Sequence, residues 1–148
     1  VKGRPQDHPL ILHVASMNDI THWAEEISDY AIALARAFWP GPMTLIFNRS
    51  ENAKDFVTGG QNTVGLRVPD HPILQALLAT LGEPIMTTTL QLPDEGLPES
   101  DPELIRDRIG RQVDLIIDGG ACGLEPTTII DLTAAPPVLV RAGLGPFP

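Results

Sequence analysis

The sequence has little of several features that define common protein classes. It contains one cysteine, Cys122, which excludes an internal disulfide framework and a cysteine-based structural zinc site. Its longest apolar runs extend over about half a dozen residues, whereas a membrane-spanning helix requires roughly 20. No apolar segment follows the first five residues, so we expect no signal peptide and take the cytoplasm as the expected compartment.

Basic residues are also scarce. Ten Lys and Arg face nineteen Asp and Glu, which makes the net charge −9 and the isoelectric point about 4.7. A generally basic nucleic-acid-binding surface is therefore not expected, because counterion release requires clustered cations. With 43% hydrophobic and 20% charged residues, the chain of 148 residues otherwise has the composition and size of one globular domain.

Motifs of several enzyme classes are absent. The chain contains no G-x-x-x-x-G-K-[ST] phosphate loop, no G-x-G-x-x-G fingerprint and no G-x-S-x-G nucleophile elbow. Its four histidines show no compact metal-binding spacing. Cys122 lies between Gly120 and Gly123 with no basic residue beside it, so a small loop or buried residue is a better interpretation than a catalytic thiol.

Fifteen prolines and thirteen glycines divide the chain into short elements. Apolar runs predict strands, and apolar residues at helical spacing behind capping residues predict helices. The expected strands cover 10–14, 43–47, 63–68, 85–90, 113–117, 128–132 and 138–141; the expected helices cover 18–26, 28–38, 70–81 and 100–109. Ser100 and Glu103 fit a capping box. Because the elements lack a strict βαβ rhythm, we expect an α/β domain with a mixed sheet.

Cationic residues at element ends are the first candidates for chemistry. Lys2 and Arg4 lie on either side of Gly3, where they could neutralise an oligophosphate, although a flexible basic terminus would show the same pattern. Arg67 lies inside an otherwise apolar strand. Such an arginine needs a partner or a ligand, because an unpaired buried charge is costly.

Hydroxyl and imidazole groups are the second set of candidates. Thr87 and Thr89 fall on one face of an expected strand and could bind a ligand, although threonine is also a good strand former. His13 lies in the apolar run Leu10–Val14, where a hydrogen-bonded core histidine is the default interpretation.

Five segments then read, in order, K-G-R-P-x-x-H-P-L-I-x-H-V, F-W-P-G-P-M-T-L-I, T-V-G-L-R-V-P-D-H-P, T-T-I-I-D-L and V-L-V-R-A-G-L-G. Together they resemble the YrdC/YwlC family, the threonylcarbamoyl-AMP synthases. The resemblance extends from Lys2 to Gly145. It implies a single YrdC-like (DHBP synthase-like) domain over residues 1–148, with a twisted mixed sheet, flanking helices and a concave cleft. About fifty residues that normally precede K-G-R-P in the family would be missing, which would leave a sheet edge unpaired.

The resemblance also implies a reaction, in which L-threonine, bicarbonate and ATP condense to threonylcarbamoyl-AMP and pyrophosphate for tRNA threonylcarbamoyladenosine formation. Lys2 and Arg4 would hold the nucleotide phosphates as catalytic residues. The other ATP-side residues would be His8, Thr63, Thr89 and Arg141, and the threonine-side residues His13, Arg67, Thr87 and Thr127. Mg²⁺ would accompany the phosphates, without a dedicated metal site in the protein. Partner proteins of tRNA modification are implied too.

One segment departs from the family pattern. The usual S-T-S-A-N reads Thr87-Thr88-Thr89-Leu90-Gln91, so a hydroxyl remains but the asparagine does not. The following L-P-D-E-G-L-P-E-S-D-P-E-L-I resembles the YciO branch. Two alternatives therefore stand beside the synthase: a YciO-like protein that binds or hydrolyses a nucleotide or threonylcarbamoyl-AMP, and a double-stranded RNA-binding module, which the net charge of −9 disfavours.

Overall fold

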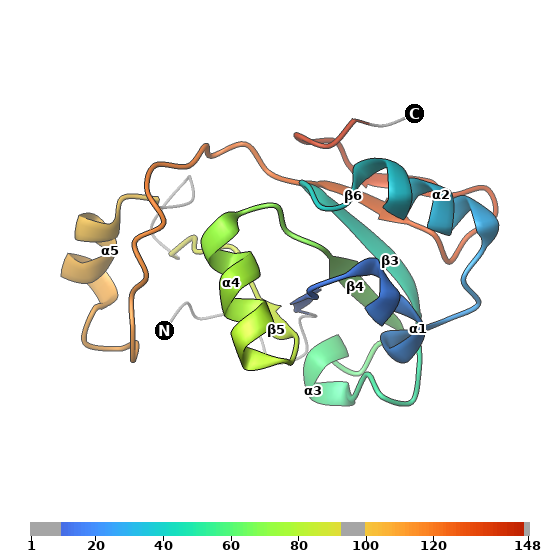
Figure 1. The fold of residues 1–148 in the computed structure, drawn as a ribbon, viewed down its shortest axis with the longest axis horizontal. Coiled ribbons are helices and arrows are strands. Elements are labelled where there is room, and N and C mark those ends of the chain that lie inside the picture. Colours follow the sequence, from blue (N-terminus) through green and yellow to red (C-terminus); the bar gives the residue numbers. More distant parts are fainter. Residues whose placement is uncertain (1–9, 93–99, 147–148) are drawn as a thin grey trace. The chain divides into compact units, whose positions relative to one another are not determined.

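The structure is a computed structural model that describes residues 10–92 and 100–146 (Figure 1). These residues form two compact units. The larger unit comprises residues 10–87 and 126–146, and the smaller comprises residues 88–92 and 100–125. No helix within the described ranges is both long and apolar enough to span a membrane.

All strands found among the described residues belong to the larger unit and form one mixed sheet. The strands are β1 (Ile11–His13), β2 (Ala24–Glu25), β3 (Met43–Arg49), β4 (Thr63–Arg67), β5 (Ile85–Thr87), β6 (Thr128–Asp131) and β7 (Val138–Arg141). Their order is β5-β1-β4-β3-β6-β7, and β2 pairs with β3. β1 runs parallel to β4 and β3 parallel to β6, whereas the other pairs are antiparallel. The expected mixed α/β architecture is confirmed.

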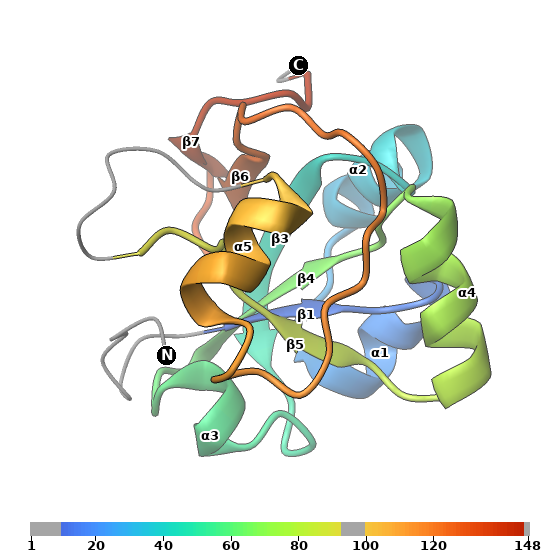
Figure 2. The same ribbon diagram turned by 90° about the vertical axis from the view of Figure 1, so that its left-hand side faces the viewer.

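Helices of the larger unit cover one face of this sheet. They are a 3-10 helix η1 (Met17–Asp19), α1 (Ile20–Trp23), α2 (Asp29–Phe38), α3 (Asp55–Thr58) and α4 (Pro72–Leu81). Buried Leu12, Leu45 and Leu66 from three adjacent strands join Ile20 of α1 and Leu34 of α2 in one core. Figure 2 shows α1 and α2 on the same side of the strands. Burial of this apolar layer is the main stabilising contribution to the unit.

Local signals explain where the two longest helices begin and end. The Ser28 hydroxyl accepts a hydrogen bond from the Ala31 N–H at the start of α2. The helix ends at Phe38, because Pro40 disfavours a helical conformation of the preceding residue, Trp39, which is extended. α4 begins with Pro72 behind a His71 cap, and it ends at Gly82, whose φ of 72° is a left-handed conformation. Both helices were expected from the sequence.

Several expected boundaries are wrong. The helix expected over 18–26 ends at Trp23, because residues 24–25 leave it to pair with β3 as β2. The strand expected over 85–90 ends at Thr87. The short helix α3 was not predicted, because its four residues are too few to show a helical period.

The smaller unit contains one helix among its described residues, α5 (Pro102–Ile109). Asp101 caps this helix through the Glu103 N–H, so the expected capping box of Ser100 with Glu103 is wrong by one position. The strand expected over 113–117 is also wrong. That segment has no paired strand in the described part of the chain, and a strand without a partner leaves its backbone groups unsatisfied.

Candidate functional site

The register of the sheet places four of the candidate side chains on one face. Residues that lie opposite each other on neighbouring strands point to the same face. His13 lies opposite Arg67 on β4, and Ile11 lies opposite Thr87 on β5. Alternation along β4 places Thr63 on the same side as Arg67. These side chains therefore share the face opposite the apolar core, which we call the polar face: His13, Thr63, Arg67 and Thr87.

His13 and Arg67 form the centre of the polar face. Both side chains are half-buried. Burial, followed by the positive charge of Arg67, lowers the pKa of His13 to about 4. The imidazole is therefore neutral at pH 7. Its Nδ1 atom is buried and has no hydrogen-bond partner within the described ranges, which leaves it available to a ligand hydroxyl or amine. The interpretation of His13 as an ordinary hydrogen-bonded core residue is therefore not supported.

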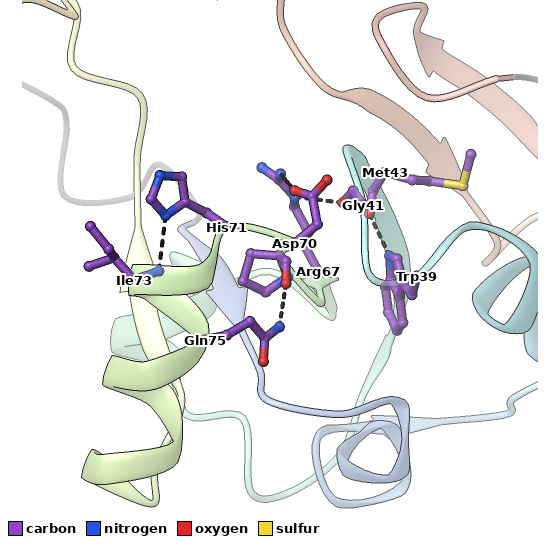
Figure 3. Close-up of polar contacts among 9 residues, drawn as sticks. Trp39, Gly41, Met43, Arg67, Asp70, His71, Ile73 and Gln75 are labelled. Carbon is purple, nitrogen blue, oxygen red and sulfur yellow. Dashed lines mark hydrogen bonds and ion pairs between the residues drawn. The ribbon is translucent and has the colours of Figure 1, made fainter. Parts of the chain in front are cut away.

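Arg67 has two polar neighbours. Its Nε–H donates a hydrogen bond of 2.9 Å to the Gly41 carbonyl, and its Nη2 lies 4.0 Å from the Asp70 carboxylate (Figure 3). Burial lowers the pKa of the guanidinium, and the charge of Asp70 acts in the opposite direction. Arginine nevertheless stays charged in proteins, so this strand carries a permanent cation that can bind a carboxylate through two hydrogen bonds.

Thr87 and Thr63 are the other two residues of the polar face. The Thr87 hydroxyl donates to the Ile11 carbonyl at 3.2 Å, so its oxygen remains able to accept a further bond. Thr63 lies opposite Asn48 on β3. The Asn48 side-chain amide donates to the Glu26 carboxylate at 2.6 Å, which holds this edge of the polar face in place.

Arg141 and Thr127 form a second cluster. The Arg141 Nε–H donates to the Thr127 carbonyl at 3.0 Å, and Nη2 donates to the Thr127 hydroxyl at 3.1 Å. The resemblance assigned Arg141 to ATP and Thr127 to threonine, but the structure places the two side chains in direct contact. Both belong to the larger unit, near the ends of β7 and β6.

The other candidates lie outside the described residues or in the smaller unit. Lys2, Arg4 and His8 lie outside the described residues. Thr89 is exposed and belongs to the smaller unit. Because β5 ends at Thr87, the alternation that was expected to place Thr87 and Thr89 on one face does not extend to Thr89.

Sequence reasoning did not single out Gly41 or Asp70, the two neighbours of Arg67. Both lie within quoted segments, F-W-P-G-P-M and R-V-P-D. The signal was present: a glycine between two prolines marks a special backbone conformation. Its contact with Arg67, 26 positions away, could not be predicted from the spacing.

A separate hollow of about 770 Å³ lies against the other face of the sheet. Its lining includes Leu12, Trp23, Phe56, Leu78 and Met86, with Asp19 and Glu83 among its polar residues. Neither Lys nor Arg lines this hollow in the described part of the chain. It therefore suits an anionic ligand less well than the polar face does.

The arrangement of the described side chains also shows whether they could bind a metal ion directly. Within residues 10–92 and 100–146, no group of three His, Cys, Asp or Glu side chains could hold one. The Asp131 carboxylate on β6 instead accepts bonds from the backbone N–H and the hydroxyl of Thr133, at 2.8 and 2.6 Å. These described residues do not fit a dedicated metal site, so we derive no step through one.

Comparison with known proteins gives a consistent result. A family model for Sua5, YciO and YrdC proteins, whose description is "Telomere recombination", matches residues 1–143. The uncharacterized protein YciO of Escherichia coli K12 is 40% identical over 146 residues, which cover 98% of this chain and 70% of that protein. The crystal structure of E. coli YciO superimposes with a TM-score of 0.88 and 39% identity, over 99% of this chain and 71% of the other.

A threonylcarbamoyl-AMP synthase of Pyrococcus abyssi is 42% identical over 144 residues. The match covers 96% of this chain but only 42% of that synthase. The crystal structure of P. abyssi Sua5 complexed with L-threonine superimposes with a TM-score of 0.89 and 38% identity, over 96% of this chain and 42% of the other. The chain thus spans less than half the length of these two proteins.

Proposed function

Because this chain belongs to the Sua5/YciO/YrdC family, we propose that it acts as a threonylcarbamoyl-AMP synthase. In the proposed reaction, the amino group of L-threonine and bicarbonate form a carbamate with loss of water. A carbamate oxygen then bonds to the α-phosphorus of ATP, and the bond to pyrophosphate breaks. The products are threonylcarbamoyl-AMP and pyrophosphate, for use in tRNA modification.

The observation that carries the proposal is the pair of His13 and Arg67. A permanent cation beside a neutral imidazole with a free Nδ1 suits an amino acid that has both a carboxylate and a hydroxyl. We assign the carboxylate to Arg67 and the hydroxyl or amine to His13, with Thr87 as a further hydrogen-bonding group. Positioning of reactants in this way can account for much of the rate enhancement, without a covalent nucleophile.

We further propose that the nucleotide binds beside the amino acid. Arg141 and Thr63 are the described residues of the larger unit that we assign to it, and Lys2, Arg4 and His8 are assigned to it from outside the described residues. Mg²⁺ would enter on the phosphates of ATP, where it would neutralise charge.

The test is release of pyrophosphate from ATP by the purified chain. We expect release that requires both L-threonine and bicarbonate. At a subsaturating concentration of L-threonine, Arg67→Gln should lower the threonine-dependent release about ten- to a hundredfold, whereas Arg36→Gln, on an exposed position of α2, should leave it unchanged. Absence of any threonine- or bicarbonate-dependent release by the unsubstituted chain would contradict the proposed synthase activity.

A second candidate is a YciO-type activity, in which the protein binds or hydrolyses a nucleotide or threonylcarbamoyl-AMP. It is favoured by the 40% identity to YciO and by Gln91, where synthases usually carry asparagine. If the chain is a synthase weakened at this position, Gln91→Asn should raise its activity. An unchanged synthase activity together with hydrolysis of threonylcarbamoyl-AMP would favour the YciO-type function.

A further inference from the structure

Residues Trp39–Met43, which we call the proline strap, connect α2 to β3. The strap is closed by its own hydrogen bond, in which the Trp39 indole N–H donates to the Met43 carbonyl at 2.7 Å (Figure 3). Trp39 is buried in the core, with 8% of its surface exposed. The indole therefore anchors a backbone turn that the two prolines already restrict.

Gly41 at the centre of the strap makes two bonds to adjacent residues at the end of β4. Its N–H donates to the Val68 carbonyl at 2.9 Å, and its carbonyl accepts the Arg67 Nε–H at 2.9 Å. A side chain is not tolerated here, because a Cβ on residue 41 would lie 2.5 Å from the Phe38 carbonyl oxygen. Only glycine lets the strap approach Arg67 in this conformation.

The strap is also fixed on its other side. The Pro42 carbonyl accepts a bond of 3.0 Å from the Thr128 N–H on β6. Thr128 directly follows Thr127, the partner of Arg141. Bonds from β4 and β6 together prevent the Gly41 carbonyl from shifting relative to the sheet.

We propose that the proline strap positions Arg67 for end-on recognition of a carboxylate, with Gly41 as the positioning residue. Arginine binds a carboxylate through two N–H groups, from either the Nε edge or the pair of Nη atoms. The Gly41 carbonyl occupies Nε, which leaves the two Nη atoms for the ligand. The exposed Asp70 carboxylate lies 4.0 Å from Nη2, which is longer than a hydrogen bond, so Asp70 does not occupy either Nη donor. The inference rests on the proposed function, in which the ligand is the carboxylate of L-threonine.

The experiment measures L-threonine affinity by isothermal titration in the presence of ATP and Mg²⁺, for the unsubstituted chain, Gly41→Ala, Arg67→Lys and the double variant. We expect each single substitution to weaken binding about tenfold, the size expected when a hydrogen bond to a charged group is lost. Because Gly41 acts through Arg67, the double variant should bind no more weakly than Arg67→Lys alone. Gly123→Ala, where a Cβ meets no atom within 4 Å, is the matched control and should leave affinity unchanged.

A second readout does not depend on substrate. In the ligand-free protein we expect the NMR signal of the Arg67 Nε–H to be protected from exchange with water, and to lose this protection in Gly41→Ala. Should Gly41→Ala fail to fold, Trp39→Phe takes its place, because it removes the N–H that closes the strap and keeps an aromatic ring.

The possible failures are distinguishable. Protection that survives in Gly41→Ala, or effects that simply add in the double variant, would overturn the role of the strap while leaving the proposed function standing. If the unsubstituted chain binds no L-threonine, the proposed function fails. In that case the positioning role would be overturned as well. Protection of the Arg67 Nε–H that still depends on Gly41 would then show only that the proline strap supports β4 structurally.

Discussion

At the scale of single residues, Arg67 and His13 respond differently to the same environment. Both are half-buried side chains that face each other across parallel strands. Burial lowers the pKa of both groups, but the guanidinium starts so high that it stays charged, whereas the imidazole becomes neutral at physiological pH. One strand pair thereby presents a fixed cation next to an uncharged hydrogen-bonding group.

Replacement of Arg67 tests the cation. Arg67→Gln keeps a polar side chain but removes the charge and the fork of donors. We expect affinity for L-threonine to fall about ten- to a hundredfold, the range for a lost hydrogen bond to a charged group, while affinity for ATP changes less than twofold. Isothermal titration of both ligands measures this. Equal losses for the two ligands, or a loss in the surface control Arg36→Gln, would argue against a carboxylate site at Arg67.

The lowered pKa of the His13 imidazole can be tested through the pH dependence of the free energy of unfolding. The pKa of His13 is about 4 in the folded protein and about 6.5 when unfolded. Between these values the unfolded chain binds a proton that the folded protein does not bind. The free energy of unfolding should therefore decrease as the pH falls from 6.5 to 4, by at most about 1.4 kcal/mol for each pH unit.

The measurement is urea unfolding at several pH values between 4 and 7.5. His13→Gln should show a shallower loss of stability over this range than the unsubstituted chain. The control Arg36→Gln, on an exposed position of α2, should keep the original slope, because arginine stays charged over this range of pH. Carboxylates titrate in the same range, but they do so in all three proteins, so the difference between slopes isolates His13.

At the scale of elements, glycines at the ends of strands decide how segments approach one another. Gly143 follows β7, and its N–H donates to the Thr128 hydroxyl at 3.1 Å. A Cβ at this position would lie 2.2 Å from the Pro126 carbonyl oxygen and 2.7 Å from the Thr127 carbonyl carbon. Both are backbone atoms, so they cannot move aside as the end of a flexible side chain could.

Gly143→Ala should therefore separate β7 from the segment that leads into β6. We expect a loss of about 2 kcal/mol or more, typical of a severe steric clash, and a fall in Tm of roughly 5–10 °C for a chain of this size. Thermal unfolding followed by circular dichroism checks this. A Tm no lower than that of Gly123→Ala, where the added Cβ has open space, would show that the backbone adapts without cost.

The elements also show what local patterns can predict. α2 and α4 agree with the sequence because caps, prolines and glycines are local signals. The prediction of a strand over 113–117 was wrong, because an apolar run forms a strand only where a partner strand is present. The segments 24–25 and 55–58 were wrongly assigned or missed, because two or four residues contain too little periodicity.

At the scale of the whole molecule, charge is the relevant property. The net charge of −9 repels the phosphate backbone of nucleic acids unless cations cluster. In the larger unit, Arg49 is paired with Asp55 at 2.7 Å and donates a further hydrogen bond to the Thr58 hydroxyl at 2.9 Å. Its charge is therefore already neutralised by a carboxylate, which makes it a poor partner for a phosphate chain.

We therefore expect no measurable binding of a labelled RNA duplex of about 20 base pairs at 150 mM salt, and weak, steeply salt-dependent binding at 50 mM. Fluorescence anisotropy at the two salt concentrations provides the measurement. Tight binding that does not change between them would contradict an electrostatic origin and would favour the double-stranded RNA-binding alternative.

The sequence by itself determined the mixed α/β class, the positions of the longer elements and the identities of His13, Arg67 and Thr87 as candidates, because those conclusions depend on local patterns and on ordered motifs. Only the tertiary structure decided that His13 faces Arg67, that Thr127 bonds to Arg141 and that Gly41 holds the Arg67 guanidinium. Such contacts depend on strand register and on the close approach of segments far apart in the chain. Neither is set by local spacing, because register follows from how the whole sheet buries its apolar face.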